Sequence, residues 1–244
     1  MSHQIALLLR DRYLTLVAWV ISHMKDWTFK NFADDFDGHV REQLPWYDLV
    51  TEAVVFIAKN YIPQGGQVYD IGCSTGNITK KLLPTIIERK ATICGIDNEK
   101  SMLDRYKKSF KEKKLPVSAK ISDAQHYNYS NFDVAIVFLT AMFIPKEEQE
   151  RLFFNLYQHI NEGGCIIVVD KVNDSGGYVA TVLKRLAMHF KLLNGADSAD
   201  IIDKELRLSG IQRPIDEQDF SGKVTQFFQM GEFKGWIIEN DSKR

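Results

Sequence analysis

Short apolar runs alternate along the chain with longer segments in which apolar residues recur every three or four positions. Five runs of the first kind predict β-strands, at residues 67–71, 92–96, 117–121, 132–139 and 165–169. Helical spacing predicts helices at residues 47–60, 77–88 and 146–160. Asn98 or Ser101 is placed to cap one more helix. This alternation predicts an α/β fold with a mostly parallel sheet and helices on both of its faces.

The helix at 47–60 shows its apolar residues on one predicted face. The members of that face are Leu49, Val50, Ala53, Val54 and Ile57. Pro63 and the pair Gly65-Gly66 end this helix and lead into the first strand. We expect the face to pack against the sheet.

The pattern changes after the fifth strand. Residues 173–216 are largely polar with helical spacing and contain no strand signal. Two further strands follow at 224–230 and 233–239, joined by Gly231-Glu232, which is typical of a hairpin. The sequence therefore predicts a parallel sheet that ends in an antiparallel hairpin, with a helical insertion at about 173–216.

The length of 244 residues suits one sizeable α/β domain, which we place at residues 47–244. Residues 1–46 form the predicted N-terminal helical extension or lid. Its apolar stretches, 5–9 and 14–21, are separated by Arg10-Asp11-Arg12 and fall short of the roughly 20 residues of a membrane span. No basic region precedes them and no small-residue cleavage site follows. We expect an amphipathic helix that covers the domain or meets a partner chain, such as the second copy of a homodimer.

The amino-acid composition limits the kinds of partner that we expect this protein to bind. The formal net charge is −1, so no overall positive field attracts nucleic acid or an anionic membrane. The cysteines are three and far apart, at Cys73, Cys94 and Cys165, which favours a reducing, cytoplasmic location over a disulfide framework or a zinc site. Metal-ligand spacing is absent from His39, His126, His159 and His189 as well, so we expect no metal.

The most informative segment is the glycine turn after the first strand. An apolar run ends at Asp70, turns on Gly72 and Gly76, and opens a helix, while the next strand ends at Asp97. This order is typical of a nucleotide-type ligand lying across the carboxyl ends of two parallel strands.

The turn departs from the dinucleotide fingerprint G-x-G-x-x-G, because Cys73 and Ser74 stand where its second glycine is needed. A pyrophosphate is therefore disfavoured, and Asp70 would repel phosphate but attract a cation. Asp97 is placed to accept hydrogen bonds from ribose hydroxyls. S-adenosylmethionine has a ribose, no phosphate, and positive sulfonium and ammonium groups, so the residues favour it over NAD.

Two neighbouring residues complete this interpretation. Asp123 follows the third strand, where an acid can meet the adenine amino group, and Ala124 would supply a backbone amide. Asp123 alone is equally well explained as a turn or cap residue. Cys73 could be a nucleophile at a helix N-terminus, but no histidine lies near it in sequence. Methyl transfer relies mainly on alignment of the reacting groups, so no residue is named as catalytic.

The motif order, the glycine turn and the hairpin resemble class I S-adenosylmethionine-dependent methyltransferases, with their Rossmann-like fold, over residues 47–240. A closer similarity is to carboxy-S-adenosylmethionine synthases, enzymes related to tRNA wobble-uridine modification. The motifs that carry it are Asp26-Trp27-Thr28-Phe29, Pro45-x-Tyr47, Val68-Tyr69-Asp70-Ile71-Gly72-Cys73-Ser74, Ile96-Asp97-Asn98, Thr140-x-x-Phe143, Asn161-x-Gly163-Gly164 and Phe227-Phe228-Gln229.

The resemblance implies that the nucleoside and amino-acid parts of the cofactor are held by Tyr47, Gly72, Cys73, Ser74, Asp97, Asn98 and Asp123. With the residues argued above and their neighbours, the full expected cofactor-binding set is Tyr47, Asp70, Gly72, Cys73, Ser74, Gly76, Asp97, Asn98, Met102, Asp123, Ala124 and Phe138.

Two positions depart from the synthase pattern. Phe138 aligns with the family's asparagine near the end of the fourth strand, and Glu205 aligns with the arginine that grips the extra carboxylate. A carboxylate in place of that arginine would repel the extra carboxylate of the cofactor. This repulsion would weaken cofactor binding by on the order of 1 kcal/mol. Arg207 or Arg213 could supply the charge from a shifted position.

We therefore expect ordinary methyl transfer from S-adenosylmethionine to an unidentified, small-molecule acceptor. The alternatives are a carboxy-S-adenosylmethionine synthase that uses prephenate, and a non-enzymatic accessory subunit that binds the cofactor. The expected acceptor pocket consists of Trp27, Phe29, His39, Arg41, Trp46, Phe143, Lys171 and the 173–213 segment.

Overall fold

The computed structural model describes residues 36–111, 114–172 and 176–240. They form a seven-stranded sheet in the order β3-β2-β1-β4-β5-β7-β6. The strands are β1 (Gln67–Ile71), β2 (Thr92–Asp97), β3 (Val117–Ile121), β4 (Phe132–Phe138), β5 (Ile160–Lys171), β6 (Lys223–Met230) and β7 (Phe233–Glu239). β1 to β5 pair in parallel, whereas β7 runs antiparallel to both β5 and β6. The predicted α/β fold with its terminal hairpin is confirmed.

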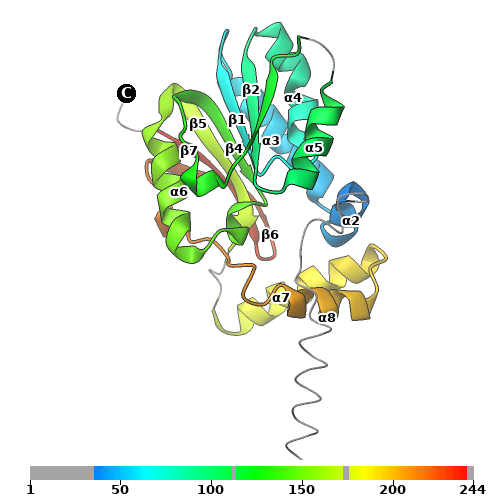
Figure 1. The fold of residues 1–244 in the computed structure, drawn as a ribbon. Helices are drawn as coiled ribbons and strands as arrows, with labels where there is room; N and C mark the ends of the chain where they lie inside the picture. Colours follow the sequence, from blue (N-terminus) through cyan, green and yellow to red (C-terminus); the bar gives the residue numbers. More distant parts are fainter. Residues whose placement is uncertain (1–35, 112–113, 173–175, 241–244) are drawn as a thin grey trace, which may run out of the picture.

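Helices lie on both sides of this sheet (Figure 1). The α-helices are α2 (Phe36–Gln43), α3 (Tyr47–Tyr61), α4 (Asn77–Glu88), α5 (Lys100–Ser109), α6 (Lys146–Gln158), α7 (Gly177–Leu193) and α8 (Ser198–Arg207). In the described part of the chain, short 3-10 turns add η2 (Ala124–His126), η3 (Ala141–Phe143) and η4 (Glu217–Asp219). α7 and α8 lie together at one end of the molecule, near α2, away from the helices that cover the sheet (Figure 1).

Alternate side chains of the central strands supply two separate cores. Val68 of β1 packs with residues of α3 and α4 on one face, and Tyr69 packs with residues of α6 on the other. Because both faces are covered, the central strands are apolar almost throughout, as buried parallel strands are. This arrangement fixes the carboxyl ends of β1, β2 and β4 at one edge of the sheet, where the glycine turn begins.

The buried face of α3 differs from the predicted one. Val50 and Val54 are buried as expected, but Leu49 is 73% exposed. Val55 and Ala58 are buried instead. The helix packs the row that contains Val50, Val54 and Ala58, at intervals of four residues, and Leu49 lies about a quarter turn away from that row.

The ends of some elements also differ from the prediction. Glu99, rather than Asn98 or Ser101, caps α5, and its carboxylate accepts a hydrogen bond from the Ser101 amide at 3.1 Å. β4 ends at Phe138 because Leu139 takes a left-handed conformation with φ of 55°. β5 begins at Ile160, earlier than expected, since Phe132 pairs with Ile160 ahead of a register shift in the ladder.

The segment after β5 is helical, as predicted. Among its described residues, the only strand-like contact is the isolated bridge between Val172 and Ile215. None of the residues of α7 is buried, although several are large and apolar, including Tyr178, Val179 and Leu193.

The predicted N-terminal extension lies outside the described residues up to position 35, and its boundary at residue 46 stays a prediction. Within the described part of the chain, no helix combines the length and apolar content needed to cross a membrane.

Candidate functional site

A cavity opens at the carboxyl ends of β1, β2 and β4, with a volume of roughly 980 Å³ that includes the space at its mouth. Every residue of the predicted cofactor-binding set except Gly76 and Asp123 lines it. The structure thus brings together Tyr47, Asp70, Gly72, Cys73, Ser74, Asp97, Asn98, Met102, Ala124 and Phe138. We call this space the cofactor cavity.

The glycine turn shapes the floor of the cofactor cavity. The amides of Gly72 and Cys73 both donate to the Ile96 carbonyl oxygen, at 2.8 and 3.1 Å, which ties the turn to β2. Gly72 has φ of 69°, and a Cβ atom there would lie 2.1 Å from Oγ1 of Thr140. Only glycine meets both conditions without displacing the segment after β4.

Gly76, the second glycine of the turn, lies outside the cofactor cavity. It precedes α4 in a left-handed conformation, with φ of 87°, and does not line the cavity. A Cβ atom on Gly76 would lie 2.9 Å from the rings of Phe110 and Tyr106. This glycine therefore allows α5 to pack closely against the turn, and any role in cofactor binding is indirect.

The carboxylate of Asp97 is held by the backbone. Oδ2 accepts a hydrogen bond from the Ser74 amide and Oδ1 accepts one from the Glu99 amide, each at 2.8 Å. Burial raises the pKa of Asp97 above its usual range, and the two amides oppose that shift by stabilising the charge. Each oxygen keeps a further lone pair for a ligand hydroxyl.

Asp70 lies deeper in the same cavity and is 2% exposed. The hydroxyl of Thr79 donates to Oδ2 of Asp70 at 2.6 Å. Burial raises the pKa of Asp70 to about 6, and the hydrogen bonds from the hydroxyl and amide of Thr79 offset only part of that shift. A positively charged ligand beside it would favour the ionised form, which fits a sulfonium or ammonium group.

Cys73 lines the cavity but is not equipped as a nucleophile. Burial raises the pKa of its thiol well above the usual value, and the negative charges of Asp70 and Asp97 add to the shift. The thiol therefore stays protonated at neutral pH, whereas a nucleophilic cysteine needs its thiolate. This agrees with the interpretation of Cys73 as a small residue in a binding turn.

Asp123 is placed differently from the prediction. It is exposed and does not line the cofactor cavity, whereas its neighbours Ser122, Ala124 and Gln125 do. Oδ1 of Asp123 instead accepts a hydrogen bond from Nδ2 of Asn98, at 2.8 Å. Asp123 therefore contacts the cavity residue Asn98 without lining the cavity itself.

Aromatic residues close the other side of the cavity. The rings of Tyr47 and Phe138 are 5.5 Å apart, and Asn77 donates to the Tyr47 hydroxyl at 3.2 Å. The guanidinium group of Arg41 lies 5.6 Å from the centre of the Tyr47 ring. Arg41 also pairs with Asp48, so this arginine supports Tyr47 rather than lining the acceptor pocket as predicted.

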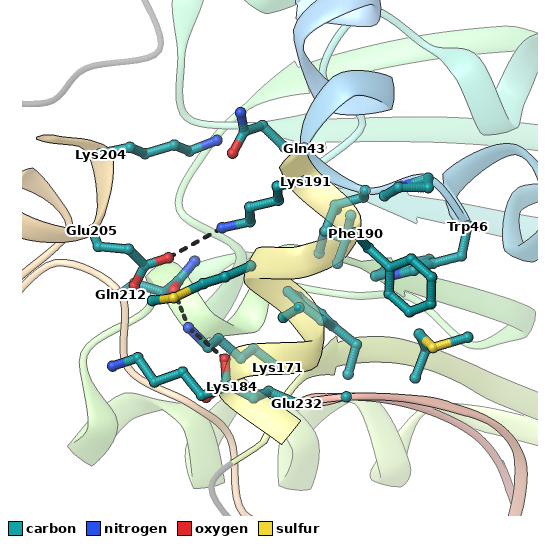
Figure 2. A pocket seen from close by; sticks show the side chains of 18 of the residues that line it. Gln43, Trp46, Lys171, Lys184, Phe190, Lys191, Lys204, Glu205, Gln212 and Glu232 are labelled. Atoms are coloured by element: carbon teal, nitrogen blue, oxygen red, sulfur yellow. Dashed lines mark hydrogen bonds and ion pairs between the residues drawn. The ribbon is translucent and has the colours of Figure 1, made fainter. Parts of the chain in front are cut away.

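A second cavity adjoins the first. Its lining comes from α2, η3, α7, α8, β5 and the turn between β6 and β7, and its volume is roughly 1240 Å³ including the space at its mouth (Figure 2). Val40, Leu139 and Phe143 line both cavities. The two spaces therefore meet at the carboxyl end of β4. We call the second one the acceptor cavity.

Several residues predicted for the acceptor pocket lie in this cavity, namely Trp46, Phe143 and Lys171. Residues of α7 and α8 line it too, as expected for the 173–213 segment. Trp27 and Phe29 lie outside the described residues, as does the side chain of His39.

Sequence reasoning missed Asp170, at the carboxyl end of β5. It is fully buried, and Oδ2 accepts the amides of Thr140 and Ala141 at 3.1 and 2.7 Å, while Oδ1 accepts the Lys171 amide at 2.8 Å. Burial raises the pKa of Asp170 to about 7, against the effect of these amides. The signal was present, because Asp170 ends an apolar strand just as Asp70 and Asp97 do.

The residues that separate the two cavities were also missed in part. Leu139 and Thr140 follow β4 and were expected as strand and motif residues only.

In the described part of the chain, no group of three or more His, Cys, Asp or Glu side chains is arranged to hold a metal ion.

Comparisons with known proteins match this architecture. Residues 68–164 match the family model of a methyltransferase domain. A carboxy-S-adenosyl-L-methionine synthase from Staphylococcus epidermidis is 31% identical over 78% of this chain and 82% of its own length. The enzyme of the same name from Shewanella sp. (strain MR-7) is 26% identical over 88% and 92%.

Among solved structures, magnesium protoporphyrin IX methyltransferase from Synechocystis PCC 6803, with bound S-adenosylhomocysteine, has a TM-score of 0.53. The match covers 82% of this chain and 86% of the methyltransferase chain. At 14% sequence identity, it shows the shared fold alone. The matched family and the synthase relatives identify S-adenosylmethionine as the cofactor of this chain. The chain belongs to the class I S-adenosylmethionine-dependent methyltransferase family, as a relative of its carboxy-S-adenosyl-L-methionine synthases.

Proposed function

We propose that this enzyme transfers the methyl group of S-adenosylmethionine to a small molecule held in the acceptor cavity. The observation that carries the proposal is the junction of the two cavities at Val40, Leu139 and Phe143. A cofactor in the first cavity would direct its methyl group toward this junction. An acceptor in the second cavity would approach from the opposite side, which is the alignment that methyl transfer needs.

The residues of the cofactor cavity suit the parts of S-adenosylmethionine. Asp97 is oriented to accept the ribose hydroxyls, and Asp70 offers a buried negative charge to the cationic end of the cofactor. Tyr47 and Phe138 supply apolar surface around the ligand. The sulfonium leaves as a neutral thioether, so the protein needs to position the two reactants and exclude water more than to move protons.

Carboxy-S-adenosylmethionine synthesis is the second candidate, since the relatives named above carry that name. The carboxylate of Glu205, aligned with the synthase arginine, pairs here with Lys191 at 3.2 Å. Arg207 pairs with Asp203 on the surface, and neither Arg207 nor Arg213 lines the acceptor cavity. The described lining of the cavity contains no arginine, and the position that aligns with the synthase arginine carries a negative charge, which favours ordinary methyl transfer.

Native mass spectrometry of freshly purified protein separates the two candidates. S-adenosylmethionine or S-adenosylhomocysteine as the retained ligand supports methyl transfer, and the carboxylated cofactor contradicts it. Formation of S-adenosylhomocysteine by the isolated chain, with a pool of small-molecule acceptors, would also exclude the accessory-subunit alternative.

Asp97→Ala tests the placement of the ribose. Saturating S-adenosylhomocysteine should raise the melting temperature of the unmodified protein, because a ligand that binds only the folded state stabilises it. We expect Asp97→Ala to abolish this rise, with an affinity loss of at least about tenfold, or about 1.4 kcal/mol. The exposed Asp104→Ala variant, on α5, is the matched control, because Asp104 does not line the cofactor cavity, and it should keep most of the rise. An unchanged rise in Asp97→Ala would show that the ribose lies elsewhere.

A further inference from the structure

Among the described residues that line the acceptor cavity are four lysines and two carboxylates, Glu205 and Glu232 (Figure 2). The lysines come from β5, α7 and α8 and are Lys171, Lys184, Lys191 and Lys204. Helices far from the sheet core thus bring positive charge to one side of a cavity that joins the cofactor cavity.

Each carboxylate is already paired with one lysine. Nζ of Lys171 lies 3.3 Å from Glu232, and Nζ of Lys191 lies 3.2 Å from Glu205. Both lysine side chains are only 13% exposed, so water screens these charges weakly. Among the described lining residues, lysines outnumber carboxylates by four to two, so their side chains together carry a net positive charge at neutral pH.

The charges lie close enough to affect one another. Burial alone would raise the pKa of Glu205, yet its pKa is lowered by the surrounding Lys171, Lys191 and Lys184. Burial lowers the pKa of Lys204 to about 8, and repulsion from Lys191 adds to the effect. The lysines of the described lining therefore lie close enough to repel one another, and an anionic ligand among them would offset that repulsion.

The rest of the lining is largely apolar. Leu44, Trp46, Phe190, Met230 and Phe233 are among its members. Trp46 packs on Phe233 with ring centres 5.1 Å apart. Trp46 lies on the opposite side of the pocket from Lys204 and Glu205 (Figure 2). A ligand that fits would combine a negative group with an apolar body.

We propose that the acceptor cavity binds an amphipathic anion, a carboxylate or phosphate on an apolar body, through Lys191 and the lysines around it. This inference rests on the proposed function, because it identifies the anion as the class of methyl acceptor. Glu205 competes with the anion for Lys191 and therefore weakens anion binding. An anion binds only if it interacts with Lys191 strongly enough to displace Glu205.

Binding of matched probes to the purified full chain tests the inference. The probes are 1-naphthaleneacetate, 1-naphthyl phosphate and the uncharged 1-naphthaleneacetamide, each titrated calorimetrically with and without S-adenosylhomocysteine. We expect the two anions to bind at least about tenfold more tightly than the amide. Comparison of the two anions distinguishes a carboxylate site from a phosphate site.

Two substitutions of opposite sign separate recognition from simple disruption. Lys191→Gln should weaken anion binding at least about fivefold, while Glu205→Gln should strengthen it by a similar factor, because Lys191 is then released from its partner. Lys107→Gln, on the far helix α5, is the matched charge control and should change little. A merely damaged cavity would not bind the anion more tightly.

Equal affinity for the anions and the amide would overturn the inference, as would absence of anion binding up to the solubility limit. Weaker anion binding in Glu205→Gln would do the same. S-adenosylhomocysteine binding, measured in the same titrations, reports separately on the proposed function. Absence of S-adenosylhomocysteine binding would contradict the proposed cofactor placement. The anion titrations made without S-adenosylhomocysteine would still test the inference.

Discussion

Asp170 shows how one buried side chain can hold a functional junction together. Its carboxylate accepts amides from the segment that directly follows β4, including those of Thr140 and Ala141. That segment carries Leu139, whose left-handed φ of 55° is unusual for a leucine, and Phe143, which lines both cavities. Asp170 is thus a positioning residue for the wall between cofactor and acceptor.

The pKa of Asp170, about 7, makes a prediction about stability. A carboxyl group with a higher pKa in the folded than in the unfolded chain binds protons more readily when folded. Its contribution therefore favours folding at low pH and is lost as the pH rises through about 7. Asp170→Asn removes this titration, so the free energy of unfolding of the variant, relative to the unmodified protein, should increase between about pH 5 and about pH 8 by at least about 1 kcal/mol.

Urea unfolding across that pH range measures the difference. Asp170→Glu is the control, because it keeps an ionisable group and should keep a pH dependence. Asp70 titrates in all of these proteins and cancels in the comparison. A difference between Asp170→Asn and the unmodified protein that stays constant with pH would contradict the prediction.

At the scale of elements, the glycine turn between β1 and α4 depends on its contact with the segment after β4. Gly72→Ala adds a methyl group 2.1 Å from Oγ1 of Thr140, at a φ of 69°. We expect a loss of about 1 to 2 kcal/mol from the backbone conformation and about 1 to 3 kcal/mol from the collision. Binding of S-adenosylhomocysteine should weaken as well, since the turn forms the cavity floor.

Gly65→Ala is the matched control for Gly72→Ala. Gly65 has a similar φ of 72°, but a Cβ atom there would meet nothing within 4 Å. It should show the conformational loss alone and leave cofactor binding unchanged. Chemical unfolding and calorimetric titration of both variants measure the two effects, and equal losses would show that Thr140 gives way without cost.

The elements also show where sequence reasoning succeeds. β1 and α4 were predicted with their exact ends, because an apolar run, two glycines and a helical pattern are all local signals. The pattern of acids at strand ends predicted Asp70 and Asp97 as cavity residues for the same reason. Local signals of this kind predicted the glycine turn and the two acids of the cofactor cavity, whereas Tyr47 and Asn98 were implied by the family resemblance.

Contacts between distant segments could not be predicted in the same way. The lysine cluster consists of Lys171, Lys184, Lys191 and Lys204. These lysines follow no regular spacing along the chain, so the sequence pattern does not link Lys171 of β5 to the lysines of α7 and α8. The exposure of Leu49 and the outward position of Asp123 likewise depend on how whole elements pack. Trp46, Phe143, Lys171 and the 173–213 segment were predicted for the acceptor pocket, but the way in which they enclose one cavity depends on the assembled fold.

At the scale of the whole molecule, the shared wall predicts that the two cavities influence each other. An anion in the acceptor cavity would lie near the sulfonium of the cofactor, and their attraction would be about 1 kcal/mol after screening. After transfer the cofactor becomes a neutral thioether, so this attraction disappears and the product is released more easily. The coupling must be reciprocal, because each ligand changes the affinity for the other by the same factor.

Sinefungin, which carries an ammonium group in place of the sulfonium, allows the coupling to be measured without turnover. We expect 1-naphthaleneacetate to bind about fivefold more tightly to the protein loaded with sinefungin than to the protein loaded with S-adenosylhomocysteine. The uncharged 1-naphthaleneacetamide should bind equally to both, since it lacks the charge that the ammonium attracts. Moderate salt should reduce the difference for the anion, because the cavities are open to solvent. Equal anion affinity in the two complexes would show that the acceptor's charge lies too far from the transferred methyl group to feel the cofactor, and would place the anionic group at the distant end of the lysine cluster.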